Sequence, residues 1–423
     1  MKKLISRFFS TAQMIEKASG DASGVIIGAS NGQPLIDGDM NPVAVLGPCR
    51  SGKGTSIVVP TLLTWRESAI VTDVHGELYG ITEHWRRTGA HNQVRRLAFG
   101  DPSSPDTFNF LEAIPRGMAG ELADIHALAD SLLSDGLGSG EYWRHHAQSL
   151  LSLLIIAKRP NLLASLYDVQ QALNDNAAFD ATIATYRDFN PNNEIGQAAK
   201  AAATAYAELP DQARVTVRAL VANSLAIFAS PDVARNTLRS SFDLAELRDG
   251  KSAMTLYLSF APSDLGRLQP LIRAFLAQVV RHGTQERQQT TAHRLLLVLD
   301  EFTALGRLPF LESSLAYLPG HGIKPLLVLQ SLSQLNDVYG EQNSLWQQCV
   351  IRTVLPLNDF KTAGIVADGI ARHPITPDEL LRLGRREAII LGAAAKPIRA
   401  ATLPYYENAL FKARAETGNA TAY

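Results

Sequence analysis

A glycine-rich segment near the N-terminus has the spacing of a phosphate-binding loop. The pattern G-x-x-x-x-G-K follows the apolar run at 43–46 and precedes a helix-like stretch at 56–64, which Pro60 interrupts. In such a loop, backbone N–H groups and the positive end of the following helix bind the phosphates of a nucleoside triphosphate, and the lysine reaches the β- and γ-phosphates. We therefore expect ATP to bind at Gly47, Pro48, Cys49, Arg50, Ser51, Gly52, Lys53, Gly54 and Thr55.

The position after the motif lysine departs from the usual loop. A Ser or Thr normally follows the lysine, and its hydroxyl binds Mg²⁺. Here the residue is Gly54, and Thr55 comes next. Thr55 is therefore the first candidate for the Mg²⁺ ligand, with a water molecule as the alternative.

A pair of carboxylates ends a second apolar run, at 295–299. Nucleotide hydrolysis at a P-loop uses carboxylates on a neighbouring strand, one to hold Mg²⁺ and one to polarise the attacking water. This arrangement predicts Asp300 as a Mg²⁺ ligand and Glu301 as the general base. The pair is typical of a Walker B strand when a P-loop is also present.

The next strand-like run, at 325–329, ends at Gln330. Its amide is a candidate sensor of the γ-phosphate or of the attacking water, which makes Lys53, Glu301 and Gln330 the expected catalytic set. The alternative is that Gln330 caps the following helix. Spacing alone does not choose an arginine that acts on a neighbouring subunit's site, and the candidates, each also explicable as a surface or ion-pair residue, are Arg273, Arg307 and Arg352.

The elements that must position these residues fall into two kinds. Apolar runs separated by helical segments, at 43–46, 69–72, 254–260, 295–299, 325–329, 350–355 and 388–391, predict an α/β domain with a mainly parallel sheet. Residues 117–247 carry almost only helical signals, with alanine dense at 198–207. We therefore expect an N-terminal segment at 1–40, an α/β domain at 41–116 and 248–410, an inserted all-α domain at 117–247, and a disordered tail at 411–423.

The overall composition is that of an ordinary folded protein. The 423 residues carry a formal net charge of -1, which does not demand nucleic acid or an anionic membrane as a partner. The two cysteines, Cys49 and Cys349, form no disulfide framework, so a reducing compartment such as the cytoplasm is expected. The sequence has no apolar run long enough to span a bilayer, and residues 1–9 fit an amphipathic contact with a membrane surface or a frayed terminus better than a signal peptide.

Two basic clusters are candidates for contact with a nucleic-acid backbone. One contains Arg86, Arg87, Arg95 and Arg96 close to Trp85, and the other contains Arg382, Arg385 and Arg386. Either cluster could bind single-stranded DNA electrostatically. The alternative is a solvated surface.

Several ordered motifs resemble the TraG/TraD-type coupling proteins of conjugation and type IV secretion. The glycine after Lys53 is itself a feature of that family, and the resemblance runs from about residue 40 to residue 408. His75 stands where the family commonly has Lys, and family members usually begin with transmembrane helices. Further motifs that match are the segments at 58–63, 73–79, 108–109, 300–302, 330–335, 362–363 and 376–380.

The resemblance implies a RecA-like nucleotide-binding domain with an all-α domain, assembled as a ring of six subunits with ATP and Mg²⁺ at the interfaces. It also implies that the ring delivers single-stranded DNA with its relaxase, or effector proteins, to a type IV secretion channel at the cytoplasmic face of the inner membrane. Membrane contact would be peripheral or made through partners. Two alternatives are a HerA/FtsK-like DNA pump in the cytoplasm and a nucleotide-regulated adaptor that recruits substrates and hydrolyses little.

Overall fold

The computed structural model describes residues 13–14, 23–133, 140–284, 291–369, 375–392 and 396–416. These residues divide into two compact units. The first lies within Met1–Arg95, Ala245–Ser259 and Gly283–Tyr423, and the second within Arg96–Leu244 and Phe260–His282. The predicted amphipathic segment at 1–9 lies outside the described residues.

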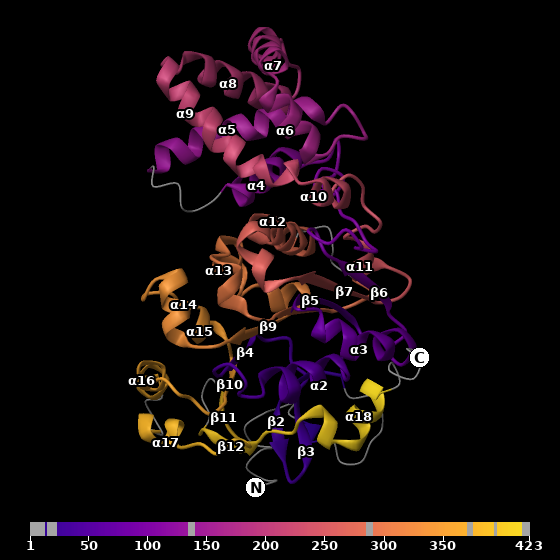
Figure 1. Ribbon diagram of the computed structural model, residues 1–423, viewed down its shortest axis with the longest axis vertical. Helices are drawn as coiled ribbons and strands as arrows, with labels where there is room; N and C mark the ends of the chain where they lie inside the picture. The colour runs from indigo at the N-terminus through magenta and orange to yellow at the C-terminus, as the bar shows by residue number, and fades with distance from the viewer. Residues whose placement is uncertain are drawn as a thin grey trace. The chain divides into compact units, whose positions relative to one another are not determined.

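A mixed β-sheet organises the first unit (Figure 1). Its central strands β10, β4, β9, β8 and β5 run parallel, and β11, β12, β2 and β3 extend it in antiparallel fashion beyond β10. The order is β1 (Gln13–Met14), β3 (Gln33–Asp37), β2 (Val25–Ser30), β12 (Ile398–Ala401), β11 (Glu387–Gly392), β10 (Ile351–Val354), β4 (Val43–Leu46), β9 (Ile323–Leu329), β8 (Leu295–Leu299), β5 (Ser68–Val74), β7 (Met254–Phe260) and β6 (Gln93–Leu97).

Five of the predicted apolar runs coincide with the parallel strands β4, β5, β8, β9 and β10, and the run at 388–391 coincides with the antiparallel β11. Every residue of β4, β8 and β9 is buried, as continuous apolar composition predicts for strands covered on both faces. The predicted α/β fold with a parallel sheet is confirmed. The hairpin of β2 and β3, within the predicted N-terminal segment, and strand β12 were not predicted.

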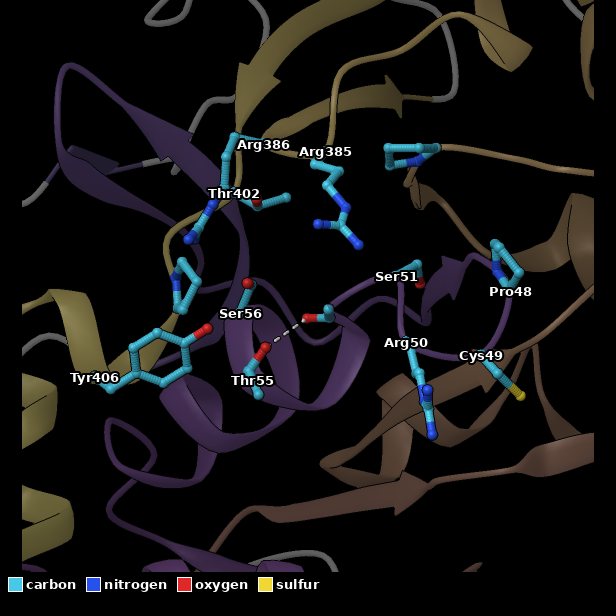
Figure 2. Close-up of a pocket in the computed structure, with 13 residues that line it drawn as sticks. Pro48, Cys49, Arg50, Ser51, Thr55, Ser56, Arg385, Arg386, Thr402 and Tyr406 are labelled. Atoms are coloured by element: carbon cyan, nitrogen blue, oxygen red, sulfur yellow. Dashed lines mark hydrogen bonds between the residues drawn. The ribbon is translucent and has the colours of Figure 1, made fainter.

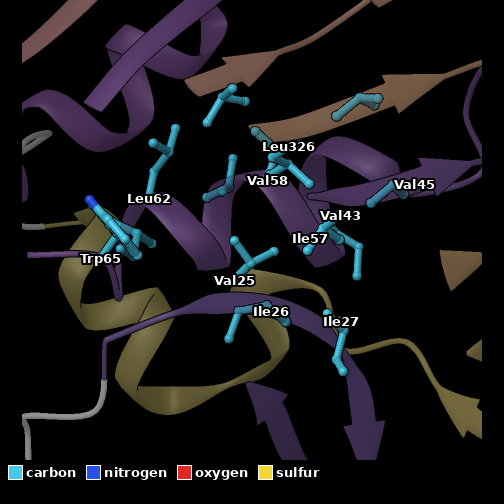
Figure 3. Packing of buried hydrophobic residues seen from close by; sticks show 14 of the residues in the cluster. Val25, Ile26, Ile27, Val43, Val45, Ile57, Val58, Leu62, Trp65 and Leu326 are labelled. Atoms are coloured by element: carbon cyan, nitrogen blue, oxygen red, sulfur yellow. The ribbon is translucent and has the colours of Figure 1, made fainter. Parts of the chain in front are cut away.

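The helix that follows the glycine-rich loop begins with a π-helical turn. This turn, η1 (Gly54–Val58), leads into α2 (Val59–Leu62), and Pro60 is the second residue of α2. Figure 3 shows Ile57, Val58 and Leu62 between Val25 and Ile26 of β2 on one side and Leu326 of β9 on the other. The sheet therefore packs both faces of this helix and fixes the loop that precedes it.

The second unit is mainly helical. Its longest segment within 117–247, α5, buries a run of apolar residues from Leu150 to Ile156. The helix α7 lies within this predicted helical segment; Asp175 caps it by accepting the backbone N–H groups of Ala177 and Ala178. The helices are α4 (Glu121–Leu132), α5 (Glu141–Lys158), α6 (Leu166–Asn174), α7 (Asn176–Asp188), α8 (Glu194–Glu208), α9 (Asp211–Leu225) and α10 (Pro231–Asn236).

The compact helical unit is wider than the predicted insertion. It also takes in residues 96–116 and most of α12 (Leu265–Thr284), which carries Pro270. Phenylalanine rings explain the difference, because Phe108 meets Phe275 of α12 at 4.9 Å and Phe99 stacks on Phe110 at 5.6 Å between ring centres. The aromatic cluster therefore holds both segments in the helical unit.

The predicted disordered tail begins inside a helix. In α18 (Ala409–Glu416), Phe411 is 1% exposed and Ala415 is also buried, so residues 411–416 are ordered by packing and the prediction is wrong for them. Residues 417–423 lie outside the described part. Among the helices of the described residues, none combines the length and the apolar character that crossing a membrane requires.

Candidate functional site

The glycine-rich loop leaves the end of β4 in a tightly constrained conformation. Gly47 donates its N–H to the Leu329 carbonyl of β9 at 3.1 Å, and Arg50 and Gly52 have φ angles of 62° and 96°. A Cβ on Gly47 would lie 2.6 Å from the Ser51 Oγ and 2.9 Å from the Leu355 Cβ. Only glycine fits there, because the loop closes on itself at this point.

The loop has room for, and chemistry suited to, a phosphate. The Ser51 Oγ is buried, and within the described residues it has no hydrogen-bond partner. Buried hydroxyls normally have partners, so this one is suited to donate to a ligand oxygen. A Cβ on Gly54 would meet nothing within 4 Å, whereas the Thr55 hydroxyl donates weakly to the Gly52 carbonyl at 3.4 Å.

Lys53 lies over its own loop. Its ammonium donates to the carbonyls of Gly47 at 2.6 Å and Pro48 at 2.9 Å, and the residue is 7% exposed. Burial lowers the pKa of this ammonium, whereas the carboxylates of Glu301 and Asp300 act in the opposite direction. The predicted lysine and the predicted acidic pair are therefore in electrostatic contact.

Asp300 and Glu301 follow β8, which is separated from the P-loop strand β4 by β9. Asp300 accepts the Glu301 N–H at 3.1 Å, and Thr72 of β5 donates to the Asp300 carbonyl at 3.0 Å. Glu301 has left-handed backbone angles, φ 52° and ψ 43°, which cost a non-glycine residue on the order of 1 kcal/mol. Burial, followed by repulsion from Glu301, raises the pKa of Asp300 to about 6.

Gln330 connects the loop to the acidic pair. Its amide nitrogen donates to the Glu301 carboxylate, and its amide oxygen accepts from the Cys49 thiol at 3.3 Å. The helix α14 (Leu332–Tyr339) is capped instead by Ser331, whose hydroxyl accepts the Gln334 N–H. The alternative role of Gln330 as that helix's cap is therefore wrong, and the contact with Cys49 was not predicted.

A cavity of about 480 Å³ borders the loop (Figure 2). Its opposite wall comes from the C-terminal part of the first unit, which sequence reasoning assigned to no nucleotide site. The basic cluster at 382–386 was the only signal that pointed toward this wall. The lining residues are Pro48, Cys49, Arg50, Ser51, Gly52, Thr55, Ser56, Pro356, Arg385, Arg386, Thr402, Pro404 and Tyr406.

The first basic cluster includes one arginine that is not accessible to nucleic acid. Arg86 is fully buried and donates to the side chains of Thr255 and Asn92 and to backbone carbonyls, while Arg87 pairs with Glu83 at 3.3 Å. The DNA-contact hypothesis is therefore wrong for Arg86. A guanidinium enclosed by its own fold is not available to a phosphate backbone.

The three arginines proposed to act on a neighbouring site have different surroundings. Arg273 is 6% exposed, Arg307 pairs with Glu312 at 2.8 Å, and Arg352 lies over the Trp346 ring at 5.5 Å. Arg307 is half-exposed and is the most accessible of the three.

The segment at 73–79 has a structural explanation. Asp73 is fully buried, and its carboxylate accepts the N–H groups of Leu78 at 3.1 Å and Tyr79 at 2.8 Å at the start of α3 (Glu77–Thr88). His75 lies in the preceding turn with φ 84° and is exposed. This motif caps a helix beside the acidic pair.

Comparison with known proteins identifies the family. A family model described as "Type IV secretory system Conjugative DNA transfer" matches residues 7–370. The chain belongs to this family. It is 32% identical over 407 residues to the conjugal transfer protein TraG of Escherichia coli, covering 90% of this chain and 63% of TraG, and 27% identical to VirD4 of Agrobacterium fabrum, covering 74% and 47%. The chain thus spans about three fifths or less of these relatives.

Solved coupling proteins share the fold. The plasmid coupling protein TrwB, in complex with the non-hydrolysable ATP analogue ADPNP, superposes with a TM-score of 0.69 at 18% identity, covering 95% of this chain and 92% of TrwB. A second TrwB structure, in complex with ADP and Mg²⁺, has a TM-score of 0.68 with the same coverage. The chain therefore has the RecA-like P-loop fold with an all-α domain that the sequence predicted.

Proposed function

We propose that this chain is an ATP-hydrolysing coupling protein that recruits DNA, with its relaxase, or protein substrates and moves them into a type IV secretion channel. The observation that carries the proposal is the hydrogen-bonded connection from Cys49 of the loop through Gln330 to Glu301. It joins the predicted phosphate-binding loop to the predicted general base. Such a connection suits a site in which phosphate binding and water activation depend on each other.

The residues have distinct roles in this proposal. Lys53 and the loop N–H groups bind the β- and γ-phosphates, and Ser51 donates its buried hydroxyl to a phosphate oxygen. Thr55 and Asp300 would hold Mg²⁺, which supplies positive charge that polarises the phosphoryl oxygens. Glu301 accepts a proton from the attacking water, and Gln330 orients that carboxylate. Bound nucleotide and Mg²⁺ in the related TrwB structures support this assignment.

Family membership supports a proposal for the assembly and location. We propose a ring of six subunits, with nucleotide at the interfaces, that binds single-stranded DNA and relaxase or effector proteins. It would act at the cytoplasmic face of the inner membrane, in contact with channel components. Sizing the protein with and without ATP and single-stranded DNA tests this part, since a monomer under every condition contradicts it.

Two substitutions test the catalytic assignment. Lys53→Ala is expected to abolish ATP turnover because the phosphates lose their cation, and Glu301→Gln is expected to retain ATP while reducing turnover at least ~100-fold. Lys412→Ala and Glu341→Gln are matched controls on exposed side chains and should behave as the parent chain does. Unchanged turnover in either site variant would remove the assignment.

Single-stranded DNA distinguishes a translocase from an adaptor. Stimulation of turnover by single-stranded DNA at low salt supports a motor that moves along a polymer. Tight binding of a relaxase or effector with negligible turnover would instead indicate a nucleotide-regulated adaptor. DNA stimulation without any affinity for channel components would favour the HerA/FtsK-like pump.

A further inference from the structure

The cavity beside the loop has two walls, and both carry arginine. One wall is the loop itself, and the other comes from residues just after β10, just before β11 and after β12 in the same compact unit. Arginines lie on both walls, at Arg50 and at Arg385 and Arg386, and none of the described residues that line the cavity is acidic. An anionic ligand therefore suits the whole cavity and not only the loop.

The far wall presents one guanidinium toward the loop. Figure 2 shows the side chain of Arg385 directed toward the side of the cavity where Ser51 lies. The next residue, Arg386, pairs with Glu407 and accepts the Thr402 N–H on its carbonyl at 2.9 Å. Arg386 therefore fixes the wall, whereas Arg385 is placed to meet a ligand bound on the loop.

An aromatic ring lies beside the helix that follows the loop. In Figure 2 the Tyr406 ring lies close to Thr55 and Ser56, and Tyr406 is 49% exposed. The short helix that carries it, η6 (Tyr405–Glu407), is held by the ion pair of Glu407 with Arg386, and the Tyr405 ring packs edge-on against the Tyr406 ring at 5.3 Å. An exposed aromatic face held in this way suits a planar ring.

We propose that Arg385 and Tyr406 complete the nucleotide site from the same chain. Arg385 contacts the phosphates from the side opposite the loop, and Tyr406 stacks on the base. This inference rests on the proposed function, because it assigns the remainder of the nucleotide to a cavity whose first wall is the P-loop. Stacking uses the π-face that every base has, so this wall accepts adenine and guanine alike.

Ligands with and without a base test the two residues separately. Binding of ADP and of inorganic tripolyphosphate is measured by calorimetry on the full chain. Tyr406→Ala is expected to weaken ADP binding on the order of tenfold and to leave tripolyphosphate binding unchanged, because tripolyphosphate has no base. Arg385→Ala is expected to weaken both ligands by similar factors, because it removes a phosphate contact.

Matched variants keep this test decisive. Tyr406→Phe retains the ring and should restore ADP binding, while Tyr317→Ala and Arg382→Ala remove exposed side chains of the same types outside the cavity and should change neither ligand. Full ADP affinity in Tyr406→Ala and in Arg385→Ala, with loss of binding in Lys53→Ala, overturns this inference alone. Full ADP affinity in Lys53→Ala as well overturns the proposed nucleotide site.

Discussion

Two arginine pairs look alike in the sequence, but one member of the first pair is buried and both members of the second are exposed. Arg86 is fully buried in α3, whereas Arg385 and Arg386 are exposed beside the loop cavity. Arg86 donates to the Thr255 hydroxyl at 2.8 Å, to the Glu67 carbonyl at 2.6 Å, and to the Trp65 carbonyl and Asn92. A buried guanidinium that donates its hydrogen bonds to other segments of the chain stabilises the fold. A guanidinium that faces a cavity can bind a ligand.

The same distinction applies to the two lysines that are buried among the described residues, Lys324 and Lys53. Lys324 of β9 is fully buried and binds Asp37 at 2.5 Å and the backbone carbonyls of Asp39 and Asn41, which ties the N-terminal hairpin to the central sheet. Lys53 is nearly as buried but donates only to its own loop, beside an acidic pair. Four substitutions distinguish basic side chains that stabilise the fold from basic side chains that serve the candidate site. For each variant, the free energy of unfolding is measured on nucleotide-free protein.

The largest loss of stability is expected from Arg86→Met. Methionine fills much of the space but leaves the carbonyls of Trp65 and Glu67 without a donor, so unfolding should become easier by about 4 kcal/mol. Urea denaturation measures this, with Arg87→Met as the control on an exposed ion pair that contributes under about 1 kcal/mol. Equal effects of the two substitutions would contradict the structural role assigned to the buried Arg86.

A loss of about 3 kcal/mol is expected from Lys324→Met, because Asp37 remains buried without its cation. Adding Asp37→Asn removes the stranded charge, so the double variant should recover on the order of 1 kcal/mol. The comparison is a double-mutant cycle by thermal melting. If the double variant were as unstable as the sum of the single ones, the pair would not act as a unit.

Lys53→Met should change stability by only about 1 kcal/mol. The substitution removes the donor of two loop carbonyls, which destabilises the folded state. It also removes the cost of burying a charged ammonium, so the loss and the gain partly cancel. The same variant should lose ATP turnover. A large loss of stability, as for Arg86→Met, would indicate that Lys53 has mainly a structural role.

The smallest effect belongs to Arg385→Ala, which should leave the free energy of unfolding within about 0.5 kcal/mol of the parent because the residue is exposed. Arg386→Ala is the comparison, since it also loses the ion pair with Glu407. Thermal melting of both variants, set beside their ADP binding, shows whether this wall is dispensable for folding. A destabilised Arg385→Ala would contradict its assignment to the cavity.

The sequence predicted the parts of the fold whose signal is local. Fully buried parallel strands read as apolar runs, and the polar residues at the ends of β4, β8 and β9 meet because these strands are neighbours. The roles of Lys53, Asp300, Glu301 and Gln330 stay predictions, but the structure gathers these four residues.

Other features depend on contacts between distant segments, which no local pattern encodes. The hydrogen bond of Cys49 with Gln330 spans 281 positions, and the wall that carries Tyr406 is defined only when the C-terminal segment returns to the loop. The burial of Arg86 likewise depends on Thr255, 169 positions away. The sequence shows that a side chain is charged, but only the folded structure shows which groups it contacts.

The place of β9 between β4 and β8 has a mechanical consequence. Gln330, at the end of β9, is hydrogen-bonded to Cys49 on one side and to Glu301 on the other, and it leads directly into α14. If the loop and the acidic pair moved apart, the Gln330 side chain could not keep both hydrogen bonds. It would have to lose its bond to Cys49 or its bond to Glu301. Gln330 is thus placed so that a change in the distance between the loop and the acidic pair would alter its hydrogen bonds next to the start of α14.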